Sequence, residues 1–391
     1  MIPYGRQEIT AADIEAVVQT LKSDFLTQGP AVPRFEQLVA ERVKARHALA
    51  MNSATSALHV ACLALGLREG ELLWTVPNTF VASANCARYC GATVDFVDID
   101  PQTWNLSIPR LEQKLLSARK AGRLPKVVVP VHFAGQPTDQ ERIAELAEEF
   151  GFRVIEDASH AIGAAHAGEP VGSCRWSDIT VLSFHPVKII TTGEGGMALT
   201  NDDELAERMA MFRSHGVTRD PARLLHAPEQ AGASVPAWYY EQQLLGYNYR
   251  MTDIHAALGT SQLGRLDEYV RGRNLSARVY DRQLKEMPLQ LPSVRSENLS
   301  AFHLYVVRLL PQAMARKTHR QTFEDLRRRG IGVNLHYMPV HLQPYYRGLG
   351  FAPGMFPEAE AHGESAITLP LFPAMTQQQQ DEVVAAIKEV L

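Results

Sequence analysis

The stretch SFHPVKIITTGEGG (183–196) places a lysine in surroundings that do not favour a cation. The chain has only 9 lysines against 30 arginines, and most of the lysines lie on charged helical faces or in polar turns. Lys188 instead follows Val187 and precedes two isoleucines, and no other charged residue occurs between positions 186 and 193. A cation in an apolar stretch costs stability unless it is paired or chemically modified. Lys188 therefore either pairs with a buried carboxylate or takes part in chemistry.

Two other motifs could bind parts of one ligand. VIEDASHAIGA (154–164) ends a strand-like run with Glu156 and Asp157, and a carboxylate there can accept a hydrogen bond from a protonated nitrogen. His160 follows and could face the same ligand. NSATSALHVACLAL (52–65) places hydroxyl residues at the start of an apolar helix, where free amides suit an anion such as phosphate. Taken alone, the first motif could equally be a salt-bridge partner or a helix cap, and the second a plain N-cap.

A third polar cluster precedes a helix in GYNYRMTDIHAALG (246–259), where Asn248 and Arg250 lie among aromatic residues. Its simpler explanation is a polar start to the helix. The glycines of GEGG in the lysine stretch could likewise serve only as a turn into the strand GGMALT. Neither a Walker loop nor G-x-G-x-x-G precedes a helix, so the sequence does not support a nucleotide-binding loop of either type. The 14 histidines show no metal-ligand spacing with carboxylates, and we expect no metal.

An anion site, a strand-end carboxylate and an isolated amine together match the needs of pyridoxal 5′-phosphate. This cofactor requires a phosphate site, a carboxylate for its ring nitrogen, an amine that forms a Schiff base, and usually an aromatic ring that stacks on it. Phe80, in VPNTFVASAN, could supply the ring. A protonated ring nitrogen makes the cofactor an electron sink, which stabilises a carbanion at the substrate carbon.

The elements that must position these residues alternate between helical and strand periods, and the C-terminal part contains a long helical pattern over 252–287 and a strand-like run over 330–337. Such alternation predicts an α/β fold with a mainly parallel sheet covered on both faces, and ligands of such sheets bind at the carboxyl ends of the strands. We expect a large domain over 1–250, to whose substrate site the N-terminal segment contributes, and a smaller α+β domain over 251–391. Residues 217–246 have no sustained period and are expected to form a long functional or mobile loop.

The composition of the chain limits the classes of function that it could have. The chain has 391 residues, of which 46% are hydrophobic and 21% charged, and its net charge is −4, so it lacks the basic field that nucleic acid or an anionic membrane requires. The four cysteines fit neither a zinc site nor a disulfide framework, and we expect reduced thiols. The beginning of the chain does not resemble a signal peptide, and no apolar run reaches membrane-spanning length. We expect a cytoplasmic protein.

The ordered motifs resemble one known family along almost the whole chain. LTQGP, NSATSAL, TFVASAN, VDID, PVHFAGQP, EDASHAIGA, SFHPVKIITTGEGG, RSHG, GYNYRMTDIHAALG and HYMPVH follow one another as in the sugar-nucleotide aminotransferases of the DegT/DnrJ/EryC1/StrS type. These are fold-type I pyridoxal-phosphate enzymes. The resemblance implies a large domain with a mainly parallel seven-stranded sheet, and a smaller α+β C-terminal domain.

The resemblance also assigns roles to residues of this sequence. Lys188 becomes the Schiff-base lysine and proton shuttle, Asp157 the partner of the ring nitrogen and Phe80 the stacking residue. Asn248 resembles the phosphate contact given by the other subunit, which implies a homodimer with composite active sites. The resemblance also implies that Ala54, Thr55 and Ser183 bind the phosphate and that His160 lies near the phenolic oxygen of the cofactor. It implies that the substrate is bound by Tyr4, Asp24, Phe25, Leu26 and Thr27.

His160 points to one subfamily of this family, because many family members have glutamine at that position. ASHA, SFHPVK, NSATSAL and RSHG together are most similar to the subfamily that forms UDP-4-amino-4,6-dideoxy-N-acetyl-β-L-altrosamine on the pathway to pseudaminic acid. That subfamily uses a UDP-linked 4-keto-6-deoxy sugar as acceptor and L-glutamate as amino donor.

Three other interpretations remain open at this point. The chain could aminate another nucleotide-linked keto sugar, such as a dTDP-linked 3- or 4-keto sugar. It could be a pyridoxamine-dependent sugar dehydratase, although relatives of that kind replace the lysine. It could be a non-catalytic sensor on the same fold, although a sensor has no need to keep Lys188 together with Asp157, Ser183 and Asn248.

Overall fold

The computed structural model describes residues 1–226 and 235–391. Its helices are α1 (Ala11–Leu21), α2 (Ala31–Val43), α3 (Ala54–Ala64), α4 (Ala82–Tyr89), α5 (Ile108–Ala121), α6 (Gln140–Phe150), α7 (Asp203–Arg213), α8 (Asp253–Leu263), α9 (Leu266–Leu284), α10 (Pro311–Met314), α11 (His319–Arg328), α12 (Pro344–Arg347), α13 (Pro357–Gly363) and α14 (Gln377–Val390), with short 3₁₀ turns at η1 (Phe133–Gly135), η2 (Pro221–Arg223) and η3 (Val340–Leu342). Its strands are β1 (His47–Met51), β2 (Leu72–Thr75), β3 (Thr93–Phe96), β4 (Val127–Val129), β5 (Arg153–Asp157), β6 (Ala165–His166), β7 (Glu169–Pro170), β8 (Ile179–Ser183), β9 (Gly196–Thr200), β10 (Val217–Thr218), β11 (Glu241–Gln242), β12 (Leu289–Gln290), β13 (Asn298–Leu299), β14 (Tyr305–Leu309) and β15 (Ala366–Leu369).

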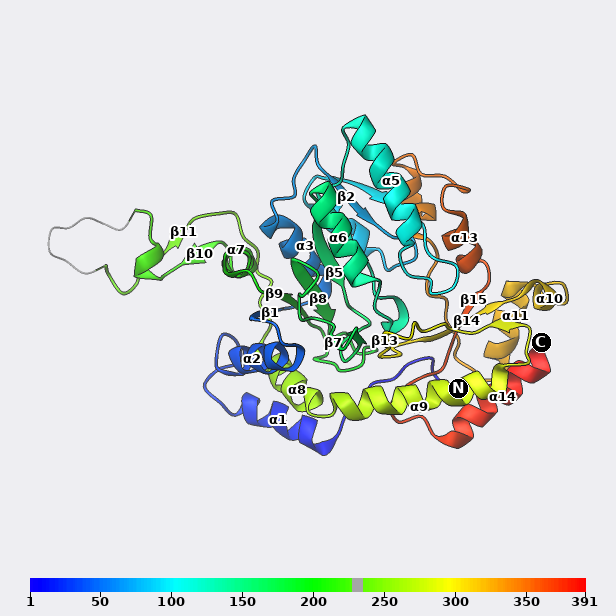
Figure 1. Ribbon diagram of the computed structural model, residues 1–391. Helices are drawn as coiled ribbons and strands as arrows, with labels where there is room; N and C mark the ends of the chain where they lie inside the picture. Colours follow the sequence, from blue (N-terminus) through cyan, green and yellow to red (C-terminus); the bar gives the residue numbers. More distant parts are fainter. Residues whose placement is uncertain (227–234) are drawn as a thin grey trace.

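The central element is a seven-stranded sheet in the order β1-β9-β8-β5-β4-β2-β3. Only β9 runs antiparallel, so the predicted mainly parallel sheet is confirmed. The chain crosses from β1 to β2 and then β3 through α3 and α4, and it returns to β4 and β5 through α5 and α6 (Figure 1). Because crossovers between parallel strands are right-handed, this reversal puts α3 and α4 on one face and α5 and α6 on the other. The carboxyl ends of the strands therefore meet at one edge between the two helix pairs.

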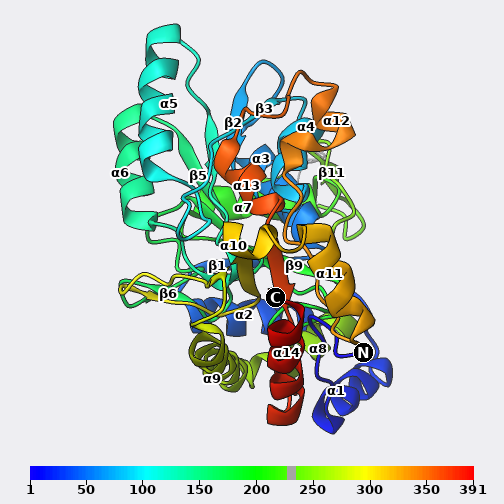
Figure 2. The same cartoon turned by 90° about the vertical axis from the view of Figure 1, so that its right-hand side faces the viewer.

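A smaller antiparallel sheet, β12-β14-β15, lies in the C-terminal part with its own apolar core. Helix α9 passes along the molecule from α8 toward α14 (Figures 1 and 2). Helix α8 packs against α1 and α2, and Ile2 pairs with Ile331. The N-terminal segment thus joins both parts of the molecule, while the division at residue 250 stays a prediction.

Two features differ from the elements that the sequence patterns indicate. The long helical pattern over 252–287 is divided into α8 and α9, because the turn at Gly264 and Arg265 ends the first helix. The strand expected over 330–337 does not form, since Ile331 bridges to Ile2 and Asn334 bridges to Thr368 in opposite orientations. In the loop over 217–246, the two-residue strands β10 and β11 pair into an arm that extends away from the body (Figure 1). Residues 227–234 of this loop lie outside the described residues.

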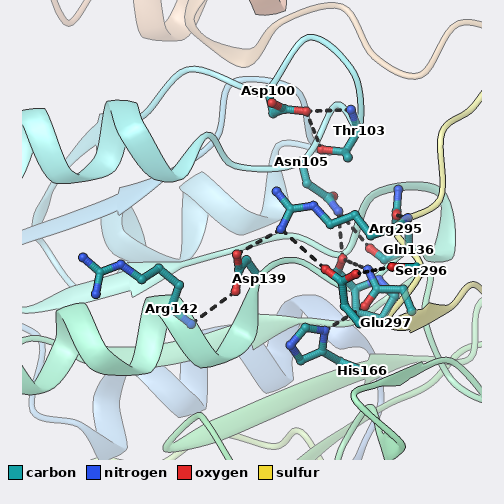
Figure 3. A network of polar contacts seen from close by, with 12 residues as sticks. Asp100, Thr103, Asn105, Gln136, Asp139, Arg142, His166, Arg295, Ser296 and Glu297 are labelled. Atoms are coloured by element: carbon teal, nitrogen blue, oxygen red, sulfur yellow. Dashed lines mark hydrogen bonds and ion pairs between the residues drawn. The ribbon is translucent and has the colours of Figure 1, made fainter.

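A polar network ties the segment before β13 to the turn after β4 (Figure 3). The backbone amide of Arg295 donates to Gln136 Oε1 at 2.9 Å, and its guanidinium donates to Asp139 Oδ2 at 2.9 Å. The side chain of Asn298 donates to the carbonyl of Pro137 at 3.0 Å. These contacts fix the path of the chain from β13 into β14 relative to the large sheet.

Gly135, at the centre of this contact, permits an unusually close approach of three backbone segments. Its φ is +100°, and a Cβ at this position would lie 2.9 Å from the carbonyl oxygen of His160 and from the amide nitrogens of Phe302 and His303. Its carbonyl also accepts a hydrogen bond from Ala301 at 2.9 Å. Glycine is required here because any side chain would push both histidine-bearing segments apart.

Replacing Gly135 by alanine should therefore destabilise the protein and displace both histidines. Gly350 provides a matched control, since its φ is +102° and a Cβ there meets nothing within 4 Å. Both variants carry the cost of positive φ, and the crowding of backbone adds about 1–3 kcal/mol to Gly135→Ala alone. Denaturant unfolding of the two variants measures the difference, and equal free energies of unfolding would contradict the packing argument.

Candidate active site

A cavity of about 460 Å³ opens at the carboxyl edge of the sheet. Asp157 at the end of β5, Ser183 at the end of β8 and Val131 just after β4 line it, together with residues that precede α3 and α4. Its volume lies in the range usual for small-molecule sites. Eight of the residues predicted from the sequence reach this cavity: Tyr4, Ala54, Thr55, Phe80, Asp157, His160, Ser183 and Lys188.

Lys188 lies half-buried on the cavity wall, in the irregular segment between β8 and β9. Its backbone amide donates to the carbonyl of His185 at 2.9 Å, which fixes the turn that presents the side chain. Burial disfavours the charged ammonium and lowers the pKa of Lys188 to about 8, although the negative charge of Asp157 opposes this shift. Among the described residues no salt bridge holds the amine. A structural ion pair among the described residues therefore does not explain this lysine, and its part in chemistry stays a prediction.

The adjacent carboxylates of Glu156 and Asp157 point to opposite faces of the sheet, as neighbours on a strand must. Glu156 is buried and accepts hydrogen bonds from Gln140 and from Thr180, with His132 nearby. Burial raises the pKa of Glu156, but the nearby His132 imidazole, 3.6 Å away, and the hydrogen bonds from Gln140 and Thr180 outweigh burial and hold the pKa below its ordinary value. Glu156 therefore serves the packing of α6 on the sheet.

Asp157 faces the cavity and keeps acceptor capacity for a ligand. Its Oδ2 accepts from the Ser83 hydroxyl at 2.6 Å, and its Oδ1 accepts from the Ser159 amide at 3.1 Å. Only 5% of Asp157 is exposed, so these two bonds orient the carboxylate without solvent. A carboxylate has about four lone-pair positions, which leaves room for a donor from a bound molecule.

The N-terminus of α3, where the sequence predicts an anion site, lies at the cavity. Ser53 is the N-cap and accepts from the Ser56 amide at 3.1 Å, while Ala54 and Thr55 occupy the first turn, whose amides have no partner within the helix. Gly196 makes this approach possible, because a Cβ there would lie 2.3 Å from the Ala54 nitrogen. Ser183 pairs with Gly196 across β8 and β9, so its hydroxyl lies beside the same helix end.

His160 is held as a neutral imidazole on the cavity wall. Its Nδ1 accepts from the backbone amide of Ala134 at 3.3 Å, which assigns the proton to Nε2, and Nε2 lies 3.1 Å from the Tyr337 hydroxyl. Burial and the nearby Lys188 charge lower the pKa of His160 well below its ordinary value. Burial and the negative charge of Asp157 raise the pKa of Tyr337, so this hydroxyl stays protonated.

The C-terminal part adds a wall to whose residues the sequence analysis assigns no role. His303, Asn334, His336 and Tyr337 all line the cavity. The His303 ring centroid lies 4.5 Å from that of His160, and its Nδ1 has no hydrogen-bond partner among the residues that the structure describes. Burial lowers the pKa of His303 well below its ordinary value and that of His336 to about 3. No local pattern could have found His303, because its importance arises from a contact with a segment far away in the sequence.

The other predicted residues lie outside this cavity. Asp24, Phe25, Leu26 and Thr27 form an exposed loop after α1, and Asn248 is exposed beside Ser214. Thr27 bridges to Thr252, and the carbonyl of Leu26 accepts from the Asp253 amide at 2.9 Å. The loop 24–27 therefore lies beside the segment 248–253, which contains Asn248, on the surface of this chain.

The residues present fit pyridoxal 5′-phosphate. Helix α3 offers free amides to a phosphate, Asp157 offers a buried acceptor, and Lys188 offers an amine whose pKa is lowered to about 8. Phe80 leaves 59% of its side chain exposed at the cavity, as a ring that stacks on a planar ligand requires. In residues 1–226 and 235–391, no group of three or more His, Cys, Asp or Glu side chains is arranged to hold a metal ion. Within the same ranges, no helix combines the length and apolar character needed to cross a membrane.

Comparison with known proteins identifies the family of this chain. The sequence model of the DegT/DnrJ/EryC1/StrS aminotransferase family matches residues 7–388. The chain belongs to this family. These enzymes depend on pyridoxal 5′-phosphate, which is therefore its cofactor, and the predicted fold-type I architecture is confirmed.

Three relatives of this DegT-family aminotransferase show how far the likeness extends. The spore coat polysaccharide biosynthesis protein SpsC of Bacillus subtilis is 36% identical over 393 residues, covering 100% of this chain and 97% of SpsC. The UDP-4-amino-4,6-dideoxy-N-acetyl-β-L-altrosamine transaminase of Campylobacter jejuni is 36% identical over 350 residues, covering 89% of this chain and 87% of that enzyme. The PMP-form of the putative sugar aminotransferase Spr1654 of Streptococcus pneumoniae superposes with a TM-score of 0.89 at 28% identity, covering 100% and 99% of the two chains.

The low pKa of Lys188 predicts a specific pH dependence in the cofactor-free enzyme. Acylation of this amine by an amine-reactive reagent, followed by peptide mass spectrometry, should rise with pH and level off above about 8, because only the neutral amine reacts. Asp157→Asn should move the midpoint to lower pH, since the carboxylate charge is what raises the pKa. A rate that keeps rising to pH of about 10, as for an ordinary lysine, would contradict the desolvation argument.

Proposed function

We propose that this aminotransferase transfers the amino group of L-glutamate to C4 of a UDP-linked 4-keto-6-deoxy-N-acetylhexosamine. The product would be UDP-4-amino-4,6-dideoxy-N-acetyl-β-L-altrosamine, an intermediate for pseudaminic acid. The observation that carries the catalytic part is the pairing of Lys188 and Asp157 in one cavity, with an amine of lowered pKa and an oriented, buried carboxylate. The cytoplasmic location expected from the sequence is part of this proposal.

Five residues of the cavity divide the tasks of the proposed reaction. When bound, pyridoxal phosphate supplies an electron sink for the pair released at the substrate carbon that exchanges its proton. Asp157 holds the ring-nitrogen side, and the amides of Ala54 and Thr55 with the hydroxyl of Ser183 hold the phosphate. Lys188 accepts and returns the proton at the carbon that bears the amine, a role for which a pKa of about 8 suits an enzyme working near neutral pH.

His160 and its neighbours shape the side of the cavity where the cofactor's phenolic oxygen would lie. The Nε2 proton of His160 donates toward Tyr337, whose hydroxyl can in turn donate into the cavity. Neutral imidazoles at His160, His303 and His336 add no positive charge beside Lys188, so they do not compete with it for Asp157. Hydrogen-bonding groups of this kind suit the hydroxyl and acetamido groups of a sugar.

The choice of sugar rests on the relatives. The transaminase from C. jejuni carries the altrosamine product in its name, and the motifs that include His160 are those that favour its subfamily. SpsC matches at the same identity over a larger share of this chain, and its name points to a spore coat polysaccharide. Another nucleotide-linked keto sugar is therefore the second candidate acceptor.

A panel of acceptors tests both parts of the proposal. Purified holoenzyme with glutamate and UDP- or dTDP-linked 3- and 4-keto sugars should convert the UDP-linked 4-keto-6-deoxy-N-acetylhexosamine in preference to the others, as followed by mass spectrometry of the products. Conversion of dTDP-linked or 3-keto sugars alone would contradict the substrate assignment.

Substitution at Lys188 tests the catalytic assignment separately. Lys188→Arg keeps the positive charge but cannot exchange a proton near neutral pH, so turnover should fall by about 10³-fold or more and the visible absorbance of the holoenzyme should be lost. A variant that retains turnover would contradict the role of this lysine, whichever sugar is used.

We further propose a homodimer in which Asn248 reaches the cavity of the other subunit. Asn248 is exposed beside Ser214 and does not line the cavity of its own chain. The neighbouring arm also exposes apolar side chains, with Trp238 79% and Leu245 77% exposed. Apolar exposure on an arm that leaves the body suits contact with a second copy of the chain.

Mixed dimers of two inactive variants test this arrangement. Lys188→Ala and Asn248→Ala subunits, when mixed and exchanged, should recover about a quarter of wild-type activity, because half of the dimers are mixed and each mixed dimer keeps one intact site. If Asn248 acts within its own chain, both sites of a mixed dimer are defective and no activity returns. Each variant alone provides the baseline.

A further inference from the structure

Arg273 on α9 is a buried cation outside the set of residues that line the cavity. Only 1% of it is exposed, and among the described residues no carboxylate forms a salt bridge with it. Burial lowers the pKa of Arg273 to about 10, so the guanidinium stays charged near neutral pH. A buried charge is costly unless hydrogen bonds compensate it. The groups that bond to this guanidinium therefore indicate what the residue does.

Three backbone carbonyls hold the guanidinium, and all of them come from the C-terminal part of the chain. The Nη1 of Arg273 donates to the carbonyl of Phe302 at 3.3 Å, and to those of His303 and Leu371 at 3.1 Å each. Hydrogen bonds from a charged donor are roughly twice as strong as bonds between neutral groups. Arg273 therefore fixes two segments that are far apart in sequence relative to each other.

These two segments continue β14 and β15 beyond the point where the strands stop pairing. The strands are antiparallel, and their register, continued by two residues, would place His303 opposite Leu371. The pairing ends before that point, and the Leu371 amide donates instead to the carbonyl of Tyr4 at 3.0 Å. The sheet therefore opens at this end, and the guanidinium of Arg273 bridges the carbonyls of the two separated strands.

Both segments hold a residue of the cavity wall in place. His303 lines the cavity, and its backbone is bonded directly to Arg273. Tyr4 also lines the cavity, and its backbone is bonded to Leu371, so one residue separates it from the guanidinium. Arg273 thus links the backbone behind two wall residues that come from opposite ends of the chain.

The backbone next to His303 needs this support. Phe302 has a φ of +43°, in the left-handed region that a large side chain rarely occupies. A residue persists in such a conformation only where surrounding contacts hold it there. The bond from Arg273 to the Phe302 carbonyl is one such contact, and the bond from the Phe302 amide to the Ser300 hydroxyl at 3.1 Å is another. Loss of Arg273 would let this turn relax and would displace His303.

We propose that Arg273 is a positioning residue of the acceptor site, which sets the places of His303 and Tyr4 in the cavity by bonding to the backbone behind them. This inference rests on the proposed amino transfer to a nucleotide-linked keto sugar. Lys188 and Asp157, to which that reaction assigns the proton transfer and the cofactor, do not belong to the segments that Arg273 holds. Loss of Arg273 should therefore weaken acceptor binding more than it slows the proton transfer.

Steady-state kinetics of the holoenzyme test this role, with the acceptor sugar that the wild type converts. Arg273→Met replaces the guanidinium by an apolar side chain without donors. KM for the acceptor should rise about tenfold or more while kcat changes by less than about threefold, because a loss of binding shared by the ground and transition states raises KM alone. A purely structural role predicts the opposite result. Less enzyme would be folded, so the apparent kcat would fall, whereas KM does not depend on the enzyme concentration. A wild-type KM in Arg273→Met would overturn the proposal, and so would a folded variant without turnover.

Gln380→Met provides the matched control. Gln380 lies on α14 and is 4% exposed, and its Nε2 donates at 2.7 Å to the carbonyl of Ser276, about one turn after Arg273 on α9. This substitution also removes a buried bond to a backbone carbonyl, but Gln380 does not line the cavity. It should lower the stability of the protein and leave KM for the acceptor unchanged. A rise in KM equal to that of Arg273→Met would show general loosening of the C-terminal part and would overturn the proposal.

A conservative variant keeps the test decisive where Arg273→Met does not fold. Arg273→Lys retains the charge but lacks the planar guanidinium, so KM should lie between the values of the wild type and Arg273→Met. Unfolding curves show which variants fold, and a wild-type KM in Arg273→Lys would overturn the proposal if Arg273→Met is unfolded. The comparison does not depend on which sugar is the acceptor. Conversion of dTDP-linked sugars alone contradicts the substrate assignment but leaves this test in place, whereas a wild type that converts none of the panel contradicts the proposed function itself.

Discussion

The desolvated amine of Lys188 is the constraint on which the rest of the site depends. An ammonium group in a cavity loses the water that stabilises it, and among the described residues the negative charge of Asp157 is what opposes this loss. The amine is therefore poised between its two protonation states, as an acid and base catalyst requires. A second carboxylate close to the amine would hold it charged, and a second cation would draw Asp157 away. The neutral imidazoles of His160 and His303 satisfy both conditions, since they are polar without being charged.

The alternation of side chains along β5 determines which carboxylate faces the amine. Glu156 and Asp157 are chemically almost identical neighbours, yet one stabilises the packing of α6 and the other faces the cavity. The parallel sheet brings the end of β5 beside the end of β8, so Asp157 and the segment that carries Lys188 meet without any contact near them in sequence. Close backbone approaches at Gly135 and Gly196 then bring in the histidine wall and the N-terminus of α3.

Much of this arrangement could be predicted from the sequence, and the failures have physical reasons. The sheet, most helices and the residues at strand ends follow from periodicity and from Lys188 lying in an apolar stretch, because those signals are local. His303 could not be predicted, since its place beside His160 depends on a tertiary contact through Gly135. The predicted strand over 330–337 failed because its two partners, Ile2 and Thr368, approach in opposite orientations and neither continues the ladder.

The charge of the cavity supports the proposed homodimer. A sugar nucleotide carries two phosphates, and glutamate carries two carboxylates, yet Lys188 is the only lysine or arginine among the residues that line the cavity in the described part of the chain. The N-terminus of α3 has partial charge for one phosphate, which the cofactor takes. Positive charge for the substrates must then come from outside this lining. Arg250, two residues after Asn248, lies half-buried with its guanidinium donating to the Ser214 hydroxyl at 3.0 Å. A second copy that delivers Asn248 to the cavity would bring this arginine close to it, and the anionic substrates would be neutralised by the same contact that completes the phosphate site.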